Sequence, residues 1–346
     1  MTHHPLERDL EYVLDHTRHL WDELRGQYLF ITGGTGFVGT WLVETFVWAN
    51  RRLGLSANIT VLSRNPSAFR EKAPEAAHDR CVTFLPGSLS QFDFPSREYP
   101  FLIHAATDQA SGFSQEEPGG TFDRELAATR RVLELARRSK AKRFLFTSSG
   151  AVYGKQPPDM ASVKEDYPGA PETTDVHSGY GQAKRASEFL CTVHGQQFGF
   201  AATIARLFAF AGPHLPLDLN FAIGNFVRDA LRGGPIRIAG DGTPRRSYLY
   251  TADLAIWLWT ILLRGQPARP YNVGSDKEVS IAELADLVVR NGAPGTSIEI
   301  ARSPTPGGPG ARYVPSVDRA REELGLRPEV SLDEAIRRMF DWYRAG

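Results

Sequence analysis

The chain has 346 residues, 42% of them hydrophobic, and its 40 Lys and Arg residues equal its 40 Asp and Glu residues. This length can bury a large core, in one large domain or in two joined domains. The formal net charge of zero and the lack of a basic tract disfavour nucleic acid or a membrane surface as partners. No apolar stretch reaches the ~20 residues of a membrane-spanning helix and no signal peptide is visible, so we expect a cytoplasmic protein.

Metal and disulfide chemistry have little support in the sequence. Cys81 and Cys191 are its two cysteines, too few for a disulfide framework, and we expect both to be reduced and buried. The Cys and His spacings typical of metal sites are absent, and His3 and His4 are an isolated pair near the N-terminus. The sequence therefore predicts no metal site.

The first part of the chain alternates strands with helices. Residues 5–25 carry apolar side chains at helical spacing and predict an extra amphipathic helix on the outside of a domain; contact with a second subunit is the alternative. The strands predicted after it are 28–32, 58–62, 82–85, 101–105, 143–147 and 201–207. The helices predicted between them are 40–50, 121–138 and 179–195. This alternation is typical of the doubly wound parallel sheet of an α/β fold.

The rest of the chain mixes loops with shorter elements. Residues 155–175 and 303–310 are rich in Pro and predict loops, and the apolar stretch 254–263 predicts a core helix. Two serines have a glutamate three positions later, which is the capping-box spacing and predicts the start of a helix. The pairs are Ser280 with Glu283 and Ser331 with Glu334, and the helices predicted from them are 280–290 and 332–344.

A strand that runs into spaced glycines is the first sign of chemistry. Residues 28–32 form a short apolar run typical of a buried parallel strand, and Gly33, Gly36 and Gly39 follow it. Such glycines allow a tight turn, close approach of backbone amides to a phosphate, and close packing of the next helix on the strand. The N-terminus of that helix would point at the anion. The pattern predicts a dinucleotide pyrophosphate site; an ordinary glycine turn is the alternative.

A tyrosine and a lysine one helical turn apart are the second sign. Tyr180 and Lys184 share one helix face, and an ammonium near a phenol favours phenolate, which lowers the pKa of the tyrosine and makes it an acid or base usable near neutral pH. Upstream, residues 144–149 read as a strand that ends in hydroxyl side chains, where ligands bind in open parallel sheets. Together the two motifs predict hydride chemistry at a carbinol or a ketone. A solvated helix face is the alternative for the pair alone.

The ordered set of motifs resembles the extended short-chain dehydrogenase/reductases, the nucleotide-sugar epimerase/dehydratase family, over nearly the whole chain from Tyr28. The matching stretches are 33–39, 104–106, 147–154, Tyr180 with Lys184, 206–213, 240–242 with Arg246, and 271–274. The resemblance implies a Rossmann domain with a smaller C-terminal substrate domain. It implies that Tyr180 is the acid/base, that Lys184 binds the nicotinamide ribose and tunes Tyr180, and that Ser149, rather than Ser148, contacts the reacting sugar oxygen.

The resemblance also implies which residues hold the cofactor and how the chain divides. The predicted cofactor-binding residues are Gly33, Thr35, Gly36, Phe37, Val38, Gly39, Ser63, Arg64, Ser88, Leu89, Ala105, Ala106, Thr147, Tyr180 and Lys184. The predicted regions are an N-terminal helix in 1–26, a dinucleotide-binding domain of 27–207 with 247–274, and a nucleotide-sugar-binding domain of 208–246 with 275–346. We expect a homodimer formed through the helices 121–138 and 179–195.

Three departures from the family pattern narrow the expected chemistry. Members that catalyse 4,6-dehydration carry an Asp-Glu pair where this chain has Gly150 and Ala151, which cannot move a proton, so we do not expect 4,6-dehydration. After the second strand, NAD-preferring members have an acidic residue, whereas this chain has Ser63 and Arg64. A guanidinium suits a 2′-phosphate, so the sequence predicts NADP, with NAD as the alternative. Ser88 stands where many members have an aspartate that contacts adenine.

A nucleoside diphosphate is an anion and needs cationic and amide donors. Arg246 and Arg312 fall where the family has its diphosphate-binding arginines, and Asn225 is a third predicted substrate residue besides Ser149. Asn220 and Arg245 are weaker candidates for the same role.

The expected function follows from these departures. An NADP preference without the dehydratase pair suits reduction of a nucleotide-linked 4-keto-6-deoxyhexose by NADPH, and residues 206–213 and 221–226 are similar to such reductases. A 4-epimerase uses the same catalytic residues and is the alternative. A dinucleotide-sensing protein without activity is a third reading, disfavoured by the intact set of Ser149, Tyr180 and Lys184.

Overall fold

The computed structural model describes residues 4–107, 118–219, 221–303 and 310–345. The chain forms two compact units. The first comprises Met1–Gly154, Pro168–Leu207 and Ala255–Tyr271, and the second comprises Lys155–Tyr167, Phe208–Leu254 and Asn272–Gly346. Relative to the predicted domains, the N-terminal segment groups with the first unit, and the segments 155–167 and 247–254 group with the second.

The first unit is built on a seven-stranded sheet with the order β11-β6-β5-β4-β1-β2-β3. Its strands are β1 (Tyr28–Thr32), β2 (Asn58–Ser63), β3 (Val82–Pro86), β4 (Phe101–His104), β5 (Arg143–Ser149), β6 (Ala201–Leu207) and β11 (Pro270–Val273). The pairs from β6 to β3 are all parallel, which confirms the predicted α/β fold and its six strands. The strand β11, at the edge beside β6, was not predicted, because four residues that begin with a proline carry almost no periodic signal.

The order of the strands marks where a ligand is expected. The chain passes from β1 outward through β2 and β3 and then returns to β4 on the other side of β1. In an open parallel sheet, ligands bind at the carboxyl ends of the strands beside such a reversal. The central strands β1, β4 and β5 are almost continuously buried, as expected for a sheet covered on both faces, whereas the edge strand β3 is partly exposed.

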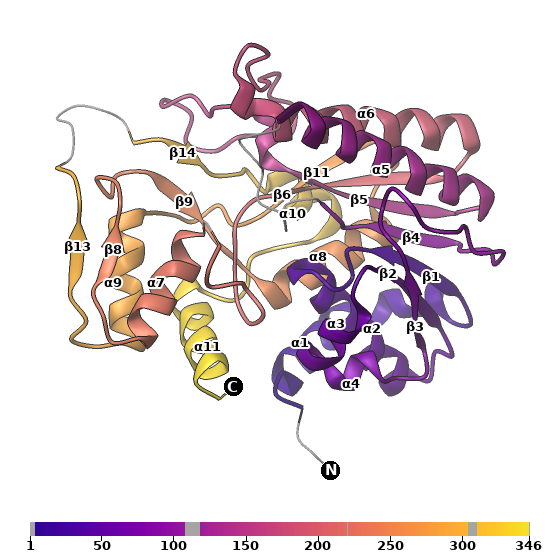
Figure 1. Ribbon diagram of the computed structural model, residues 1–346, viewed down its shortest axis with the longest axis horizontal. Coiled ribbons are helices and arrows are strands. Elements are labelled where there is room, and N and C mark those ends of the chain that lie inside the picture. The colour runs from indigo at the N-terminus through magenta and orange to yellow at the C-terminus, as the bar shows by residue number, and fades with distance from the viewer. Residues whose placement is uncertain (1–3, 108–117, 220, 304–309, 346) are drawn as a thin grey trace. The chain divides into compact units, whose positions relative to one another are not determined.

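Helices cover the two faces of this sheet (Figure 1). On one face α5 (Pro118–Arg138) packs along α6 (Gly179–Phe198), and Thr129 Oγ1 lies 3.0 Å from Ser187 Oγ between them. On the other face lies α2 (Phe37–Leu53), whose Thr45 hydroxyl accepts a hydrogen bond from the Trp259 indole of α8 (Thr251–Arg264) at 2.9 Å. The predicted core helix 254–263 is thus part of α8, and both predicted helices 121–138 and 179–195 are present.

The N-terminal segment is not one continuous helix, as expected, but α1 (Glu7–Thr17) followed by the 3-10 helix η1 (Arg18–Leu24). Its apolar face is buried, and α1 packs on α2. The Thr17 hydroxyl accepts from the Trp21 indole at 2.9 Å, and the Trp21 ring lies 4.8 Å from the Trp259 ring. The tighter turn after Thr17 therefore places Trp21 in the core of the first unit.

The remaining short elements of the first unit connect the strands. They are α3 (Pro66–Lys72), α4 (Pro74–Ala77), and the 3-10 helices η3 (Gly150–Tyr153) and η4 (Val176–Ser178).

Both cysteines are free and buried, as predicted. Within the described parts of the chain, no helix combines the length and the apolar character that a membrane crossing requires, and no cluster of three or more metal-binding side chains is found.

The second unit consists of short strands with helices beside them. Its elements are β7 (Phe210–Ala211), α7 (Ala222–Leu231), β8 (Ile236–Ile238), β9 (Arg245–Ser247), β10 (Leu249–Tyr250), β12 (Glu278–Ser280), α9 (Ile281–Gly292), β13 (Ile298–Ile300), β14 (Arg312–Tyr313), α10 (Asp318–Leu324) and α11 (Leu332–Ala345). The Ser280 side chain accepts from Glu283 N and Glu283 accepts from Ser280 N, which confirms the predicted capping box of α9. Ser331 accepts from Glu334 N at the start of α11.

Two predicted loops belong to the second unit in whole or in part. The segment 155–167 has no helix and no extended strand, and it is held by Asn272, whose side chain donates to Val163 O at 2.9 Å and whose backbone amide donates to Glu165 at 2.9 Å. Most of the predicted loop 303–310 lies outside the described residues, as does Asn220.

Candidate active site

The glycine turn between β1 and α2 has no room for side chains. Gly33 has φ +71°, and a Cβ there would lie 2.5 Å from Ala106 N, at the end of β4. A Cβ on Gly39 would lie 2.0 Å from Gly33 O. Gly36 precedes α2, whose first turn has no side-chain cap. Gly36 N donates to Gly33 O within the turn, while no side chain caps the first turn of α2, which is the arrangement that suits a pyrophosphate at the start of that helix.

The other predicted cofactor residues also lie where parallel strands end. Ser63 is the last residue of β2, and its hydroxyl accepts from Asn65 N at 3.2 Å. The Arg64 side chain between them is exposed, and it has no ion pair with any described residue. Ala105 and Ala106 follow β4, where they approach Gly33. The predicted residues of the glycine turn, β2, β4 and β5 thus share the carboxyl edge of one sheet. The residues placed there are Gly33, Thr35, Gly36, Phe37, Val38, Gly39, Ser63, Arg64, Ala105, Ala106 and Thr147.

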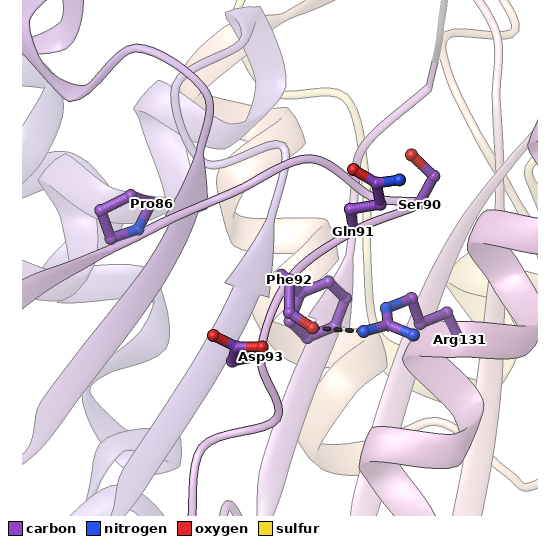
Figure 2. A pocket seen from close by; sticks show the side chains of 6 residues that line it. All are labelled: Pro86, Ser90, Gln91, Phe92, Asp93 and Arg131. Atoms are coloured by element: carbon purple, nitrogen blue, oxygen red, sulfur yellow. Dashed lines mark hydrogen bonds between the residues drawn. The ribbon is translucent and has the colours of Figure 1, made fainter.

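Ser88 and Leu89 follow β3 in the chain, between Pro86 and Ser90, which help to line a cavity of about 330 Å³ (Figure 2). This cavity is lined by Pro86, Ser90, Gln91, Phe92, Asp93 and Arg131. Arg131, from α5, donates to the Phe92 carbonyl, and its guanidinium lies 4.8 Å from the Phe92 ring centre. The cavity is therefore at the end of the sheet that the family resemblance assigns to the adenine, and none of the predicted catalytic residues lines it.

The predicted catalytic residues come together at the end of β5. Ser149 ends that strand, and its hydroxyl oxygen accepts from Ala151 N at 3.1 Å, which caps η3. The same hydroxyl is hydrogen-bonded to the phenol of Tyr180 in α6. Lys184, one turn further along α6, donates to Thr147 O at 3.2 Å, and its Nζ lies 5.8 Å from the Tyr180 ring centre. One hydroxyl, one phenol and one ammonium thus share a site.

A glycine makes this approach of α6 to η3 possible. A Cβ at Gly181 would lie 2.5 Å from Ala151 O and 2.7 Å from Pro171. Because Gly181 follows Tyr180 directly, this contact brings the phenol to the end of β5. The sequence analysis did not single out Gly181, although its place beside the tyrosine is visible in the sequence.

Burial decides the protonation of the catalytic groups. Burial raises the pKa of Tyr180, and this effect exceeds the lowering by the Lys184 charge and by the Ser149 hydrogen bond. The prediction that Lys184 brings the pKa of Tyr180 down toward neutrality is therefore wrong in its net sign. Burial, with the nearby Lys184 charge, lowers the pKa of His104 on β4 to about 3, so His104 is neutral. At neutral pH Tyr180 is a protonated phenol, able to donate a proton.

A carboxylate that the sequence analysis missed completes the site. Glu125, on α5, has its Oε1 2.6 Å from Lys184 Nζ, and both side chains are almost fully buried. The two groups form a close ion pair, and the charge and hydrogen bond of Glu125 both act to raise the pKa of Lys184. One signal was available: Glu125 falls on the same helix face as the buried residues Thr129 and Val132, where a charge is unusual.

The predicted substrate residues other than Ser149 lie in the second unit. Arg246 is in β9, and its guanidinium donates to Arg245 O at 2.8 Å and Ala311 O at 3.3 Å, without a carboxylate partner among the described residues. Arg312 is in the neighbouring strand β14 and pairs with Glu278 at 2.7 Å.

Glu278 also pairs with the weaker candidate Arg245, at 2.7 Å. Asn225 is in α7, and its side-chain oxygen accepts from Arg228 at 3.1 Å. Of the three candidate substrate arginines, Arg246 alone thus has a guanidinium without a carboxylate partner among the described residues.

Comparisons with known proteins agree with this arrangement. A model of the NAD dependent epimerase/dehydratase family matches residues 29–274. UDP-glucuronic acid decarboxylase 1 of Arabidopsis thaliana is 30% identical over 324 residues, which cover 91% of this chain and 69% of that protein. UDP-glucuronic acid decarboxylase 5 of the same plant is 30% identical over 325 residues, covering 91% of this chain and 89% of that protein.

A solved structure shares the fold. The crystal structure of UDP-glucuronic acid 4-epimerase from Bacillus cereus, in complex with UDP-glucuronic acid and NAD, has a TM-score of 0.78 at 20% identity and covers 92% of this chain and 99% of its own. The family match spans the glycine turn, the end of β5 and the helix with Tyr180 and Lys184. The chain is an enzyme that belongs to the NAD dependent epimerase/dehydratase family of extended short-chain dehydrogenase/reductases, whose members act on nucleotide sugars.

Proposed function

We propose that this protein reduces a ketone at C4 of a nucleoside-diphosphate 6-deoxyhexose, with NADPH as the hydride donor. The observation that carries the proposal is the meeting of Ser149, Tyr180 and Lys184 at the end of β5. The bound nicotinamide would supply the hydride to C4. Ser149 would hold the ketone oxygen and Tyr180 would give it a proton, so that each turnover consumes one NADPH and one proton and forms one hydroxyl group.

The protonated state of Tyr180 supports the reductive direction. A phenol whose pKa is raised by burial is a proton donor at neutral pH, as ketone reduction requires. Gly150 and Ala151, which form the first turn of η3 next to Ser149, have no side chain that could remove a proton from the sugar. The site thus has one acid/base residue, which suffices for a reduction at a single carbon.

A redox-neutral reaction is the second candidate, favoured by the relatives. The curated relatives above are named as UDP-glucuronic acid decarboxylases, and the structural neighbour as a 4-epimerase. Either reaction would use Tyr180 first as a base and then as an acid, around a transient C4 ketone, and would consume no added cofactor.

Cofactor stoichiometry separates the two candidates. Purified protein with NADPH and a 4-keto-6-deoxy nucleotide sugar should consume one NADPH per sugar. The same protein with NAD and UDP-glucuronic acid should release no carbon dioxide and form no epimer. The redox-neutral candidate would be established by two results together. The protein would consume no NADPH with the thymidine, cytidine, guanosine or uridine diphosphate form of the 4-keto-6-deoxy sugar, and it would convert UDP-glucuronic acid.

The NADPH preference rests on Arg64. Its exposed guanidinium follows β2 without a described ion pair, and no carboxylate stands beside it at residues 63–65 to repel a 2′-phosphate. Replacing Arg64 with Ser should raise KM for NADPH about 10- to 100-fold, the equivalent of a charge-assisted hydrogen bond of roughly 1.5–3 kcal/mol, and should leave KM for NADH nearly unchanged. Parallel measurements with both cofactors check this; an equal change for both would exclude a contact with the phosphate.

We further propose that Arg246 binds the diphosphate of the substrate, with Arg312 in a lesser role. Among the described residues, the Arg246 guanidinium donates only to backbone carbonyl oxygens, so no carboxylate there competes with a diphosphate for it. Arg312 would first have to break its ion pair with Glu278. The Arg246→Ala variant should therefore bind uridine diphosphate at least about tenfold more weakly, as measured by calorimetry, and Arg312→Ala should lose less. A larger loss in the Arg312→Ala variant would reverse the assignment.

A further inference from the structure

The ammonium of Lys184 is held by a carboxylate on a different helix. Lys184 Nζ and Glu125 Oε1 are 2.6 Å apart, and the whole residues are 1% and 3% exposed. Glu125 lies on α5 and Lys184 on α6, so the pair exists only because these two helices pack together. The other carboxylate oxygen of Glu125, Oε2, accepts a long hydrogen bond of 3.5 Å from Thr107, which follows β4. Two buried opposite charges in contact interact strongly, because little water screens them.

We propose that Glu125 is a positioning residue: its carboxylate fixes the Lys184 ammonium near Tyr180 and cancels part of its charge, which adds to the preference of Tyr180 for the neutral phenol that donates the proton. This inference rests on the proposed function of Tyr180 and Lys184. Glu125 need not touch substrate or cofactor for this role, since it acts through Lys184.

The charges around Tyr180 support this role. Burial alone would lower the pKa of Lys184, but the negative charge of Glu125, its hydrogen bond and the smaller effects of Tyr180 and Cys191 together outweigh burial, and that pKa is raised. Glu125 also adds to the raised pKa of Tyr180, against the lowering by Lys184. The remaining titratable groups are inactive here: His104 on β4 is neutral, and burial raises the pKa of the Cys191 thiol on α6. Glu188, one turn beyond Lys184 on α6, is also buried but pairs with Arg206 at 2.7 Å, so Glu125 is the carboxylate that pairs with Lys184.

The sign of the expected change follows from this arrangement. Removing the negative charge eases the loss of a proton from both Tyr180 and Lys184, so the first deprotonation of the pair moves to lower pH. The state with phenolate and ammonium is favoured within the pair, because its opposite charges attract. In a purely structural role, loss of the carboxylate would reduce stability and leave the titration of Tyr180 in place.

The test is a spectroscopic titration of Tyr180 that needs no substrate. The phenolate absorbance of each protein is measured against pH, and the curve of the same protein carrying Tyr180→Phe is subtracted. With Glu125→Gln the Tyr180 titration should move down by about one pH unit, as expected for a charge a few ångströms away. The alkaline limb of NADPH-linked turnover should move down with it. Glu125→Asp, which retains the charge, should restore both toward the wild-type values.

Glu188→Gln is the matched control. Glu188 is also buried on the sheet side of α6, but it pairs with Arg206 at 2.7 Å, so its loss should lower the melting temperature without moving the Tyr180 titration. The inference is overturned if folded Glu125→Gln protein that still binds NADPH shows the wild-type Tyr180 titration and the wild-type alkaline limb of turnover. It is also overturned if Glu188→Gln moves the titration and the alkaline limb as far as Glu125→Gln does. Failure of the proposed function would look different, since Tyr180→Phe would then retain turnover.

Discussion

Replacing Tyr180 with Phe is expected to lower turnover by about 10²- to 10⁴-fold and to leave NADPH binding nearly unchanged. The substitution keeps the ring in its place on α6 and removes one hydroxyl, which is hydrogen-bonded to Ser149 and is the proposed proton donor. The loss should fall on kcat, because the proton transfer occurs in the transition state. Steady-state rates and cofactor fluorescence titration measure the two effects.

Tyr153→Phe is the control for this experiment. Tyr153 is likewise buried in the first unit, and its hydroxyl accepts from Arg206 at 2.8 Å. Its loss should reduce stability by about 1 kcal/mol and leave turnover nearly unchanged. If Tyr180→Phe retained more than a tenth of the turnover, a proton donor other than Tyr180 would have to be sought.

Replacing Lys184 with Met is expected to abolish measurable turnover and to destabilise the protein by about 3–5 kcal/mol. The methionine removes the ammonium and leaves the carboxylate of Glu125 buried without its counter-charge. A second change, Glu125→Gln, should then recover most of the lost stability and none of the activity, because the buried charge is gone and the catalytic ammonium is still missing. Denaturant unfolding of the two variants and of the double variant measures the coupling.

Lys140→Met provides the comparison on the surface. Lys140 pairs with Glu98 at 2.5 Å, but its side chain is 78% exposed. Water and salt screen such a pair, so its loss should leave the free energy of unfolding nearly unchanged. Equal destabilisation by the two lysine substitutions would contradict the buried ion pair as the source of the effect.

Two corrections show where reasoning from sequence stops. The pair of Tyr180 and Lys184 is visible as a helical spacing, yet the direction in which the pKa of Tyr180 moves depends on burial, which comes from β4, β5 and α5 together. The segment 5–25 has helical periodicity throughout, but the chain tightens after Thr17 because Trp21 packs on the distant Trp259.

The sequence by itself determined six strands of the parallel sheet, the glycine turn, the capped helices and the proposed reacting groups, because each depends on neighbours within a few residues: a buried run, a Cβ that does not fit, a serine three positions before a glutamate. Only the tertiary structure decided that Glu125 contacts Lys184 and that Glu278 pairs with Arg312. It also decided that Arg246 has no carboxylate partner among the described residues. These pairs join residues that are dozens of positions apart on different elements. Their strength comes from exclusion of water, which no local pattern records.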